Sequence, residues 1–214
     1  MAGRDRPADQ PRRRGAGPGA HQGQGRFETQ FGVNHLGHFA LTSLLLEHIT
    51  GRVVSLSANA YRFGKIDFDD LNWERRKYNA NRSYAQSKLA VLLFTEELQR
   101  RLTAAGSGVR AVAAHPGAAT TNAITNSGGQ ENMMFRFINR FFAQTPAQGA
   151  LETLYAAVAD IPGGTFVGPG GRMGVSGAPK PLKLSKTALD PELGRRLWDT
   201  SAELTKVAPA PAVA

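Results

Sequence analysis

The stretch that most constrains the fold is a long amphipathic helix followed almost at once by a buried strand. Apolar side chains recur at helical spacing through SYAQSKLAVLLFTEELQRRLTAAG (83–106), at Val91, Phe94, Leu98 and Leu102. Gly106 is expected to end this helix, and VRAVAA (109–114) is typical of a buried strand. A strand of this kind, directly after an amphipathic helix, predicts a sheet covered by helices.

The rest of the chain continues the alternation of helices and strands. The expected order is helix 28–48, strand 52–57, helix 83–106, strand 109–114, helices 133–144 and 145–160, and strand 163–169. A polar loop joins the first strand to the long helix, and no internal repeat is present. This order predicts an α/β fold in which helices cover a parallel sheet.

Both ends of the chain lack residues that could build a core. Residues 1–25 consist mainly of Gly, Pro, Arg, Gln and Ala, and residues 207–214 contain only Val, Ala and Pro. Such segments cannot bury enough apolar surface to offset the entropy of ordering them. We therefore expect disordered ends around one folded domain at 26–206, a length that suits a single hydrophobic core.

Composition and charge exclude several classes of function. The chain has no cysteine, which excludes disulfides and thiol catalysis and fits a cytoplasmic compartment, and it has no apolar run that predicts a membrane span. Residues 1–26 carry +4 of the formal charge of +9, without interleaved aromatics. This pattern favours a solvated arm over specific nucleic-acid binding. His35 and His38 lack a third metal ligand at usable spacing, so packing is the favoured interpretation.

Two five-residue stretches, YRFGK (61–65) and YAQSK (84–88), place a Tyr four residues before a Lys. On a helix, residues four apart lie on one face, so the spacing brings the two side chains together. YRFGK contains Gly64 and is predicted to lie in the polar loop, whereas YAQSK opens the best amphipathic helix. A nearby ammonium is expected to lower the pKa of the Tyr84 phenol and to suit it to proton transfer.

The surroundings of YAQSK resemble the short-chain dehydrogenase/reductase family, in its retinol-dehydrogenase-like and protochlorophyllide-reductase-like branch. The resemblance covers residues 26–205, and the matching stretches are FETQFGVNHLGHFALT, RVVSLSANAYRFGKIDFDDLNW, SYAQSKLAVLLFTEELQRRL, VRAVAAHPGAATT and FVGPGG. It implies the C-terminal part of a Rossmann-like, doubly wound parallel sheet with covering helices. The implied activity is hydride transfer between NADP or NAD and a carbonyl or alcohol substrate.

The resemblance also implies roles for individual residues. Tyr84 would be the general acid/base, and Lys88 would bind the nicotinamide ribose and lower the pKa of the phenol. Asn34, from the NxxG pattern, would hold a water of the proton relay through a local distortion of its helix. Pro116 and Gly117 would form the turn over the nicotinamide. Thr121, with Thr120 beside it, would reach the carboxamide or a phosphate.

One departure from the family pattern concerns the end of the first strand. The family has two serines there, and the second steadies the substrate carbonyl. Counting back from Gly64 places Ala58 in that position, with Ser57 one residue early. Adjacent strand residues face opposite sides, so Ser57 takes over the role only with a backbone adjustment, and Asn59 is an alternative.

A second departure concerns the cofactor cradle. The TGxxxGxG turn and the NNAG strand end of the family do not occur in this sequence, and no strand precedes GAGPGAHQGQG (15–25). We expect a truncated domain that lacks the adenine and pyrophosphate site and the residue that chooses between NAD and NADP. The arginine-rich start is read either as a reading-frame or start-site change or as a natural truncated product.

Two functional hypotheses therefore remain. The first is an oxidoreductase whose substrate is lipophilic, because an apolar segment at 133–142 covers the substrate pocket in the family. The alternative is a catalytically inactive remnant that acts only through protein association. A homodimer is a possible form of such association, since the helix at 28–48 and the YAQSK helix form dimer interfaces in relatives and a severed sheet edge invites pairing.

Overall fold

The computed structural model describes residues 27–117, 146–171 and 174–207. The predicted helix at 133–144, Thr121 and the two terminal segments lie outside these residues, except for Val207. The described elements are α1 (Thr29–Phe31), π-helix η1 (Gly32–Leu36), α2 (Gly37–Leu45), η2 (Leu46–His48), β1 (Arg52–Leu56), η3 (Asn59–Phe63), α3 (Ala80–Ala104), β2 (Arg110–Ala114), α6 (Pro146–Val158), β3 (Phe166–Pro169), β4 (Pro179–Leu182) and α7 (Pro191–Thr205).

The sheet has the strand order β1-β2-β3-β4. β1 pairs with β2 in parallel, from Arg52 opposite Arg110 to Leu56 opposite Ala114, and β2 pairs with β3 in parallel. The prediction of an α/β fold with a parallel sheet is therefore confirmed for three strands. β4 is antiparallel to β3 and was not predicted, and neither was helix α7.

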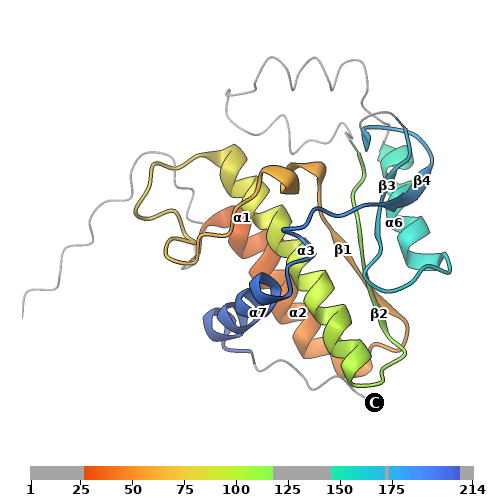
Figure 1. Cartoon of the computed structure of the whole chain (residues 1–214), viewed down its shortest axis with the longest axis horizontal. Coiled ribbons are helices and arrows are strands. Elements are labelled where there is room, and N and C mark those ends of the chain that lie inside the picture. Colours follow the sequence, from red (N-terminus) through yellow and green to blue (C-terminus); the bar gives the residue numbers. More distant parts are fainter. Residues whose placement is uncertain (1–26, 118–145, 172–173, 208–214) are drawn as a thin grey trace, which may run out of the picture.

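Helices cover both faces of the sheet. α3 lies across one face with α1, α2 and α7 packed around it, and α6 lies on the opposite side of the strands (Figure 1). Strand β2 shows why both faces need cover: Ala111 and Ala113 pack toward α3, while Val112 and Ala114 pack with Ala156 of α6. Since successive strand residues face opposite sides, the apolar part of this strand, from Ala111 to Ala114, is buried on both faces.

Helix α3 begins one turn earlier than predicted. The side chain of Asn79 accepts a hydrogen bond from the backbone N–H of Arg82, which caps a helix that starts at Ala80. Glu97 forms ion pairs with Arg101 at 2.6 Å and with Arg100 at 2.7 Å. Helical spacing would equally allow a pair between Glu96 and Arg100, but Arg100 binds Glu97 instead. Burial raises the pKa of Glu96 to about 7.

The helix predicted at 28–48 is continuous but not regular. Its α-helical parts, α1 and α2, are separated by the π-helical turn η1, and the last turn is a 3₁₀ helix. His35 lies in η1 and is buried among aromatic rings, with Phe31 5.1 Å away between centroids. Its Nε2 lies 2.7 Å from the hydroxyl of Ser201, which donates its own proton to Leu197. The packing interpretation of His35 is therefore confirmed.

Burial of His35 makes the stability of the chain depend on pH. Burial, with a smaller contribution from His38, lowers the pKa of His35 from 6.5 to about 3. The unfolded chain takes up this proton below pH 6.5 and the folded chain does not, so stability falls as the pH drops from 6.5 toward 3. The expected loss approaches about 1.4 kcal/mol per pH unit within this window.

Urea unfolding of His35→Phe, compared with the unsubstituted chain at about pH 7 and at about pH 5, measures this contribution. The variant is expected to lose less stability between the two pH values, and the exposed His48→Gln serves as the control. An equal loss in the chain and in His35→Phe would contradict the assignment.

Candidate functional site

The candidate site lies where β1 and β2 end side by side. The register places Leu56 opposite Ala114, and the backbone N–H of Ser57 donates to the carbonyl of Ala114 at 2.8 Å. The residues that follow the two strands, Ser57–Asn59 and His115–Gly117, therefore meet at one edge of the sheet. In open α/β sheets this edge, outside the carboxyl ends of the strands, is where ligands bind.

Tyr84 and Lys88 lie one turn apart on α3, as predicted. The ammonium of Lys88 is 5.6 Å from the centroid of the Tyr84 ring. The same ammonium donates to the carbonyl of Leu56 at 3.1 Å, and the hydroxyl of Ser57 donates to the carbonyl of Lys88 at 2.8 Å. Two hydrogen bonds thus fix the Tyr–Lys pair to the end of β1.

The expected lowering of the Tyr84 pKa is wrong for this structure. Burial raises the pKa of Tyr84 above its ordinary value and lowers the pKa of Lys88. Both side chains are largely removed from water, and a low dielectric disfavours the charged form of each. The sequence pattern places the ammonium near the phenol, but it carries no information on how deeply either group is buried.

The protonation state of Tyr84 can be measured directly. Ultraviolet difference absorbance between the chain and Tyr84→Phe, recorded against pH, isolates the ionisation of this phenol. We expect the Tyr84 phenolate to appear only above the ordinary pKa of tyrosine, because burial disfavours the charged form. A difference signal that titrates near neutral pH would contradict this expectation, and Tyr155→Phe serves as the control for loss of a tyrosine outside the site.

Asn34 lies within the π-helical turn η1, which confirms the predicted local distortion of its helix. Its amide nitrogen donates to Gln30 at 3.1 Å and to the hydroxyl of Ser87 at 3.0 Å. Ser87 in turn donates to the carbonyl of Tyr84 at 2.8 Å. No role was predicted for Ser87 from the sequence, although its position inside YAQSK could have indicated one. The structure shows that it joins Asn34 to the helix that carries the Tyr–Lys pair.

The second predicted Tyr–Lys stretch has a different environment. Tyr61 and its neighbours form the 3₁₀ helix η3 rather than a loop, and the Tyr61 hydroxyl accepts a hydrogen bond from the backbone N–H of Ser185 at 3.1 Å. Its ring is buried against Phe166, whereas Lys65 is exposed. Gly64 lies so close to α3 that an added Cβ would be 2.4 Å from the carbonyl oxygen of Ala85. This stretch therefore packs against α3.

The turn HPG follows β2 directly. Gly117 has a φ of 69°, a left-handed conformation that favours glycine, and its N–H donates to Nδ1 of His115 at 3.1 Å. Pro116 and Gly117 are half-buried. The structure therefore places both predicted cofactor-binding residues of this turn beside the end of β1. Their role in cofactor binding stays a prediction, as does that of Thr121.

Several known proteins are similar to this chain. Human retinol dehydrogenase 13 is 44% identical over 190 residues, which cover 83% of this chain and 54% of the human protein. Human polyprenol dehydrogenase is 34% identical over 189 residues, which cover 85% of this chain and 55% of that protein. A crystal structure of an uncharacterized protein from Mycobacterium paratuberculosis superposes with a TM-score of 0.71 at 48% identity, over 86% of this chain and 60% of that protein. No protein-family model matches the chain.

The sequence identity, the shared fold and the Tyr–Lys pair at the strand ends together decide the family. The chain belongs to the short-chain dehydrogenase/reductase family. It spans about half the length of the curated relatives it matches.

The structure also describes the end of β1, where the sequence of this short-chain dehydrogenase/reductase chain is predicted to depart from the family pattern. Ser57 is buried, and its hydroxyl proton points to the carbonyl of Lys88. Ala58, which is predicted to take the position of the family's second serine, is extended and half-buried. The amide of Asn59 donates to the carbonyl of Gly174 at 3.1 Å. The hydroxyl proton of Ser57 is therefore not free to replace a hydroxyl at residue 58, whereas the amide of Asn59 keeps a second N–H beside its bond to Gly174.

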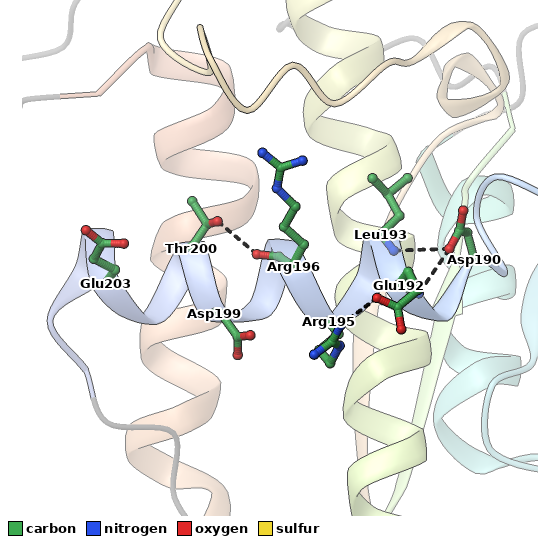
Figure 2. Close-up of a pocket in the computed structure, with 8 residues that line it drawn as sticks. All are labelled: Asp190, Glu192, Leu193, Arg195, Arg196, Asp199, Thr200 and Glu203. Carbon is green, nitrogen blue, oxygen red and sulfur yellow. Dashed lines mark hydrogen bonds and ion pairs between the residues drawn. The ribbon is translucent and has the colours of Figure 1, made fainter.

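A hollow on the surface of this short-chain dehydrogenase/reductase chain runs along α7, away from the predicted residues. Figure 2 shows its lining side chains, which come from α7 and its N-cap: Asp190, Glu192, Leu193, Arg195, Arg196, Asp199, Thr200 and Glu203. Several of them already have partners on the helix, since Asp190 caps it and Arg195 pairs with Glu192. None of the predicted site residues lines this hollow, so it is not the candidate site.

Two further observations concern residues 27–117, 146–171 and 174–207. No helix in these ranges is long and apolar enough to cross a bilayer. No three His, Asp or Glu side chains in them are grouped so that they could hold a metal ion.

Proposed function

We propose that the chain carries the catalytic end of an NAD(P)(H)-dependent oxidoreductase that interconverts an alcohol and a carbonyl compound. The observation that carries this proposal is the Tyr84–Lys88 pair, held by two hydrogen bonds at the end of β1 and next to the Pro116–Gly117 turn. Relatives named retinol dehydrogenase and polyprenol dehydrogenase support it.

In this proposal Tyr84 exchanges a proton with the substrate oxygen. Its raised pKa keeps the phenol protonated at neutral pH, so Tyr84 is ready to donate a proton to a carbonyl that is being reduced. The reverse reaction needs the phenolate and is favoured by alkaline pH. The chain is therefore better suited to reduction than to oxidation near neutrality.

Lys88 fits the role of anchor for the nicotinamide ribose. An ammonium has three N–H donors, and the described contacts use one of them, toward Leu56. The remaining donors are available for ribose hydroxyls at the mouth of the site. The nicotinamide, when bound, supplies or accepts the hydride, and the protein provides orientation and the proton. Either NADP or NAD would serve in this scheme.

The other predicted site residues take supporting roles. Pro116 and Gly117 would lie against the nicotinamide, and Thr121 would reach its carboxamide or a phosphate. Asn34, held by Ser87, would keep the proton relay in place behind Tyr84. Ser57 would act on catalysis through Lys88, because its hydroxyl binds the carbonyl of that residue.

The proposed substrate is a lipophilic alcohol or carbonyl compound. Retinol and polyprenol, in the names of the relatives, are both long apolar alcohols. The apolar segment predicted to cover the pocket, 133–142, is consistent with such a substrate.

Transfer of deuterium tests the proposed reaction. The full chain is incubated with a long-chain aldehyde and with NADPH or NADH that carries deuterium at the reactive carbon, and the alcohol product is analysed by mass spectrometry. The proposal predicts an alcohol with one deuterium, and the same mixture with heat-denatured chain serves as the control. Absence of deuterated alcohol with both cofactors would overturn the proposed activity.

We propose protein association as the second candidate function, because one side of the molecule has the character of an interface. Among the described residues β1 pairs only with β2, which leaves its other edge open. The outward face of α6 is apolar, with Leu151, Leu154 and Val158 about half or more exposed. Arg52 of β1 donates to the carbonyls of Ala156 and Ala159, so the C-terminal end of α6 lies against the strand whose edge is open.

Sedimentation of the chain over a range of concentrations tests the association. We expect concentration-dependent self-association that Leu154→Glu on α6 abolishes and that Leu189→Glu, at an exposed position outside this face, leaves intact. A monomer at all concentrations, or equal association of the two variants, would exclude this surface as the site of self-association.

A further inference from the structure

His115 is buried at the point where β2 gives way to the proposed cofactor-binding turn. Its backbone N–H donates to the carbonyl of Val167 at 2.9 Å, which extends the pairing of β2 with β3 by one residue. Its ring stacks on Phe166, with 5.3 Å between centroids and 30° between planes. The backbone and the ring of His115 are therefore both held by β3.

The hydrogen bond of the His115 ring defines its tautomer. Nδ1 accepts from the backbone N–H of Gly117 at 3.1 Å, so Nδ1 carries no proton and a neutral ring carries its proton on Nε2. Burial, together with the charge of Arg62, lowers the pKa of His115 to about 4. The ring therefore remains neutral, with Nδ1 an acceptor, throughout the neutral pH range.

The absence of a side chain at Gly168 of β3 makes room for the ring of His115. A Cβ added at Gly168 would lie 2.4 Å from Nε2 of His115, so no residue other than glycine fits there without moving the ring. Nε2 is buried and has no hydrogen-bond partner among the described residues. The polar contact that this ring makes is thus directed to the Pro116–Gly117 turn, and not to the rest of the core.

We propose that His115 is a positioning residue whose Nδ1 holds the Gly117 amide and thereby fixes the Pro116–Gly117 turn in the shape that receives the nicotinamide. The identity of the ligand, a nicotinamide cofactor, rests on the proposed function. Its structural part, the control of the turn by the ring nitrogen, stands independently of any activity. A ring that only fills space would not need an acceptor at Nδ1.

Two substitutions separate the acceptor from the ring. His115→Phe keeps an aromatic ring that can stack on Phe166 but removes the acceptor. His115→Asn loses the ring but keeps an acceptor, because an Asn side chain can bind the backbone N–H two residues later. If the acceptor at Nδ1 controls the turn, His115→Asn is expected to preserve the turn better than His115→Phe. If packing of the ring controls the turn, His115→Phe is expected to preserve it better.

The first readout is hydrogen exchange of the Gly117 amide in the full chain, measured by nuclear magnetic resonance. Loss of one hydrogen bond is expected to speed this exchange by about three- to tenfold in His115→Phe and by less in His115→Asn. Nitrogen chemical shifts of His115 in the unsubstituted chain report the tautomer without any substitution. Protonated Nδ1, or unchanged exchange in His115→Phe, would overturn the proposal.

The second readout is the dissociation constant of NADPH and of NADH. His115→Phe is expected to weaken binding of the accepted cofactor by about three- to tenfold, with His115→Asn closer to the unsubstituted chain. Equal affinity in His115→Phe and the unsubstituted chain would refute the effect on the cofactor. If the unsubstituted chain binds neither cofactor, the proposed function and this effect both fail, while the exchange and tautomer measurements still decide whether His115 fixes the turn.

Discussion

Replacement of Tyr84 by phenylalanine is expected to lower kcat for carbonyl reduction by about 10²–10⁴-fold, the usual contribution of a positioned general acid. The substitution removes only the phenol oxygen. The ring remains, and the hydrogen bond from Ser87 is kept because it goes to the backbone carbonyl of residue 84. The loss is therefore expected in kcat, with little change in the affinity for the cofactor or in thermal stability.

Tyr155→Phe is the matched control for this variant. Tyr155 lies on α6, on the opposite side of the sheet, and is half-buried like Tyr84. This control is expected to retain full activity. An active Tyr84→Phe enzyme, or equal losses in the two variants, would show that the Tyr84 phenol does not transfer the proton.

Replacement of Ala58 by serine is expected to raise kcat, by up to about 10²-fold. The resemblance to the family implies that a serine at this position would hold the substrate carbonyl, and loss of one such donor typically costs about 10²–10³-fold in rate. Here the neighbouring hydroxyl of Ser57 is committed to the carbonyl of Lys88 and cannot supply the missing donor. Residue 58 is half-buried and extended, a conformation that serine adopts freely.

The control for Ala58→Ser is Ala60→Ser, which adds the same hydroxyl two residues later in η3. Steady-state kinetics with one aldehyde and one cofactor would compare the three chains. Only Ala58→Ser is expected to gain activity. A rate that does not change, or an equal gain in both variants, would contradict the interpretation that Ala58 is a missing catalytic donor.

The sequence predicted the elements whose apolar pattern is strong. α3 and β2 follow from the helical spacing of leucines and from an unbroken apolar run. β4 (PKPL) has two prolines, a lysine and no alternation, so only its pairing with β3 makes it a strand. α7 did carry a local signal that was missed, since Asp190 followed by Pro191 is a typical helix start and Leu193, Leu197 and Trp198 share one side.

The candidate site was predictable in its residues but not in its electrostatics. The spacing within YAQSK places Lys88 next to Tyr84, and strand alternation already separates Ser57 from the position of Ala58. The direction of the Tyr84 pKa depends on burial by parts of the chain far away in sequence, which a local motif does not report. The hydrogen bond between Asn34 and Ser87 and the stacking of His115 on Phe166 likewise appear only once α3 and β2 are packed against their neighbours.

Titration of the full chain with NADPH, and separately with NADH, tests the central claim most directly. Lys88→Met removes the proposed ribose anchor, and Lys65→Met removes an exposed lysine from the other Tyr–Lys stretch. We expect that the nicotinamide fluorescence of at least one cofactor saturates, that Lys88→Met weakens this binding and that Lys65→Met does not. A signal that increases linearly with both cofactors, and equally in all three chains, would show that these residues do not form a cofactor site.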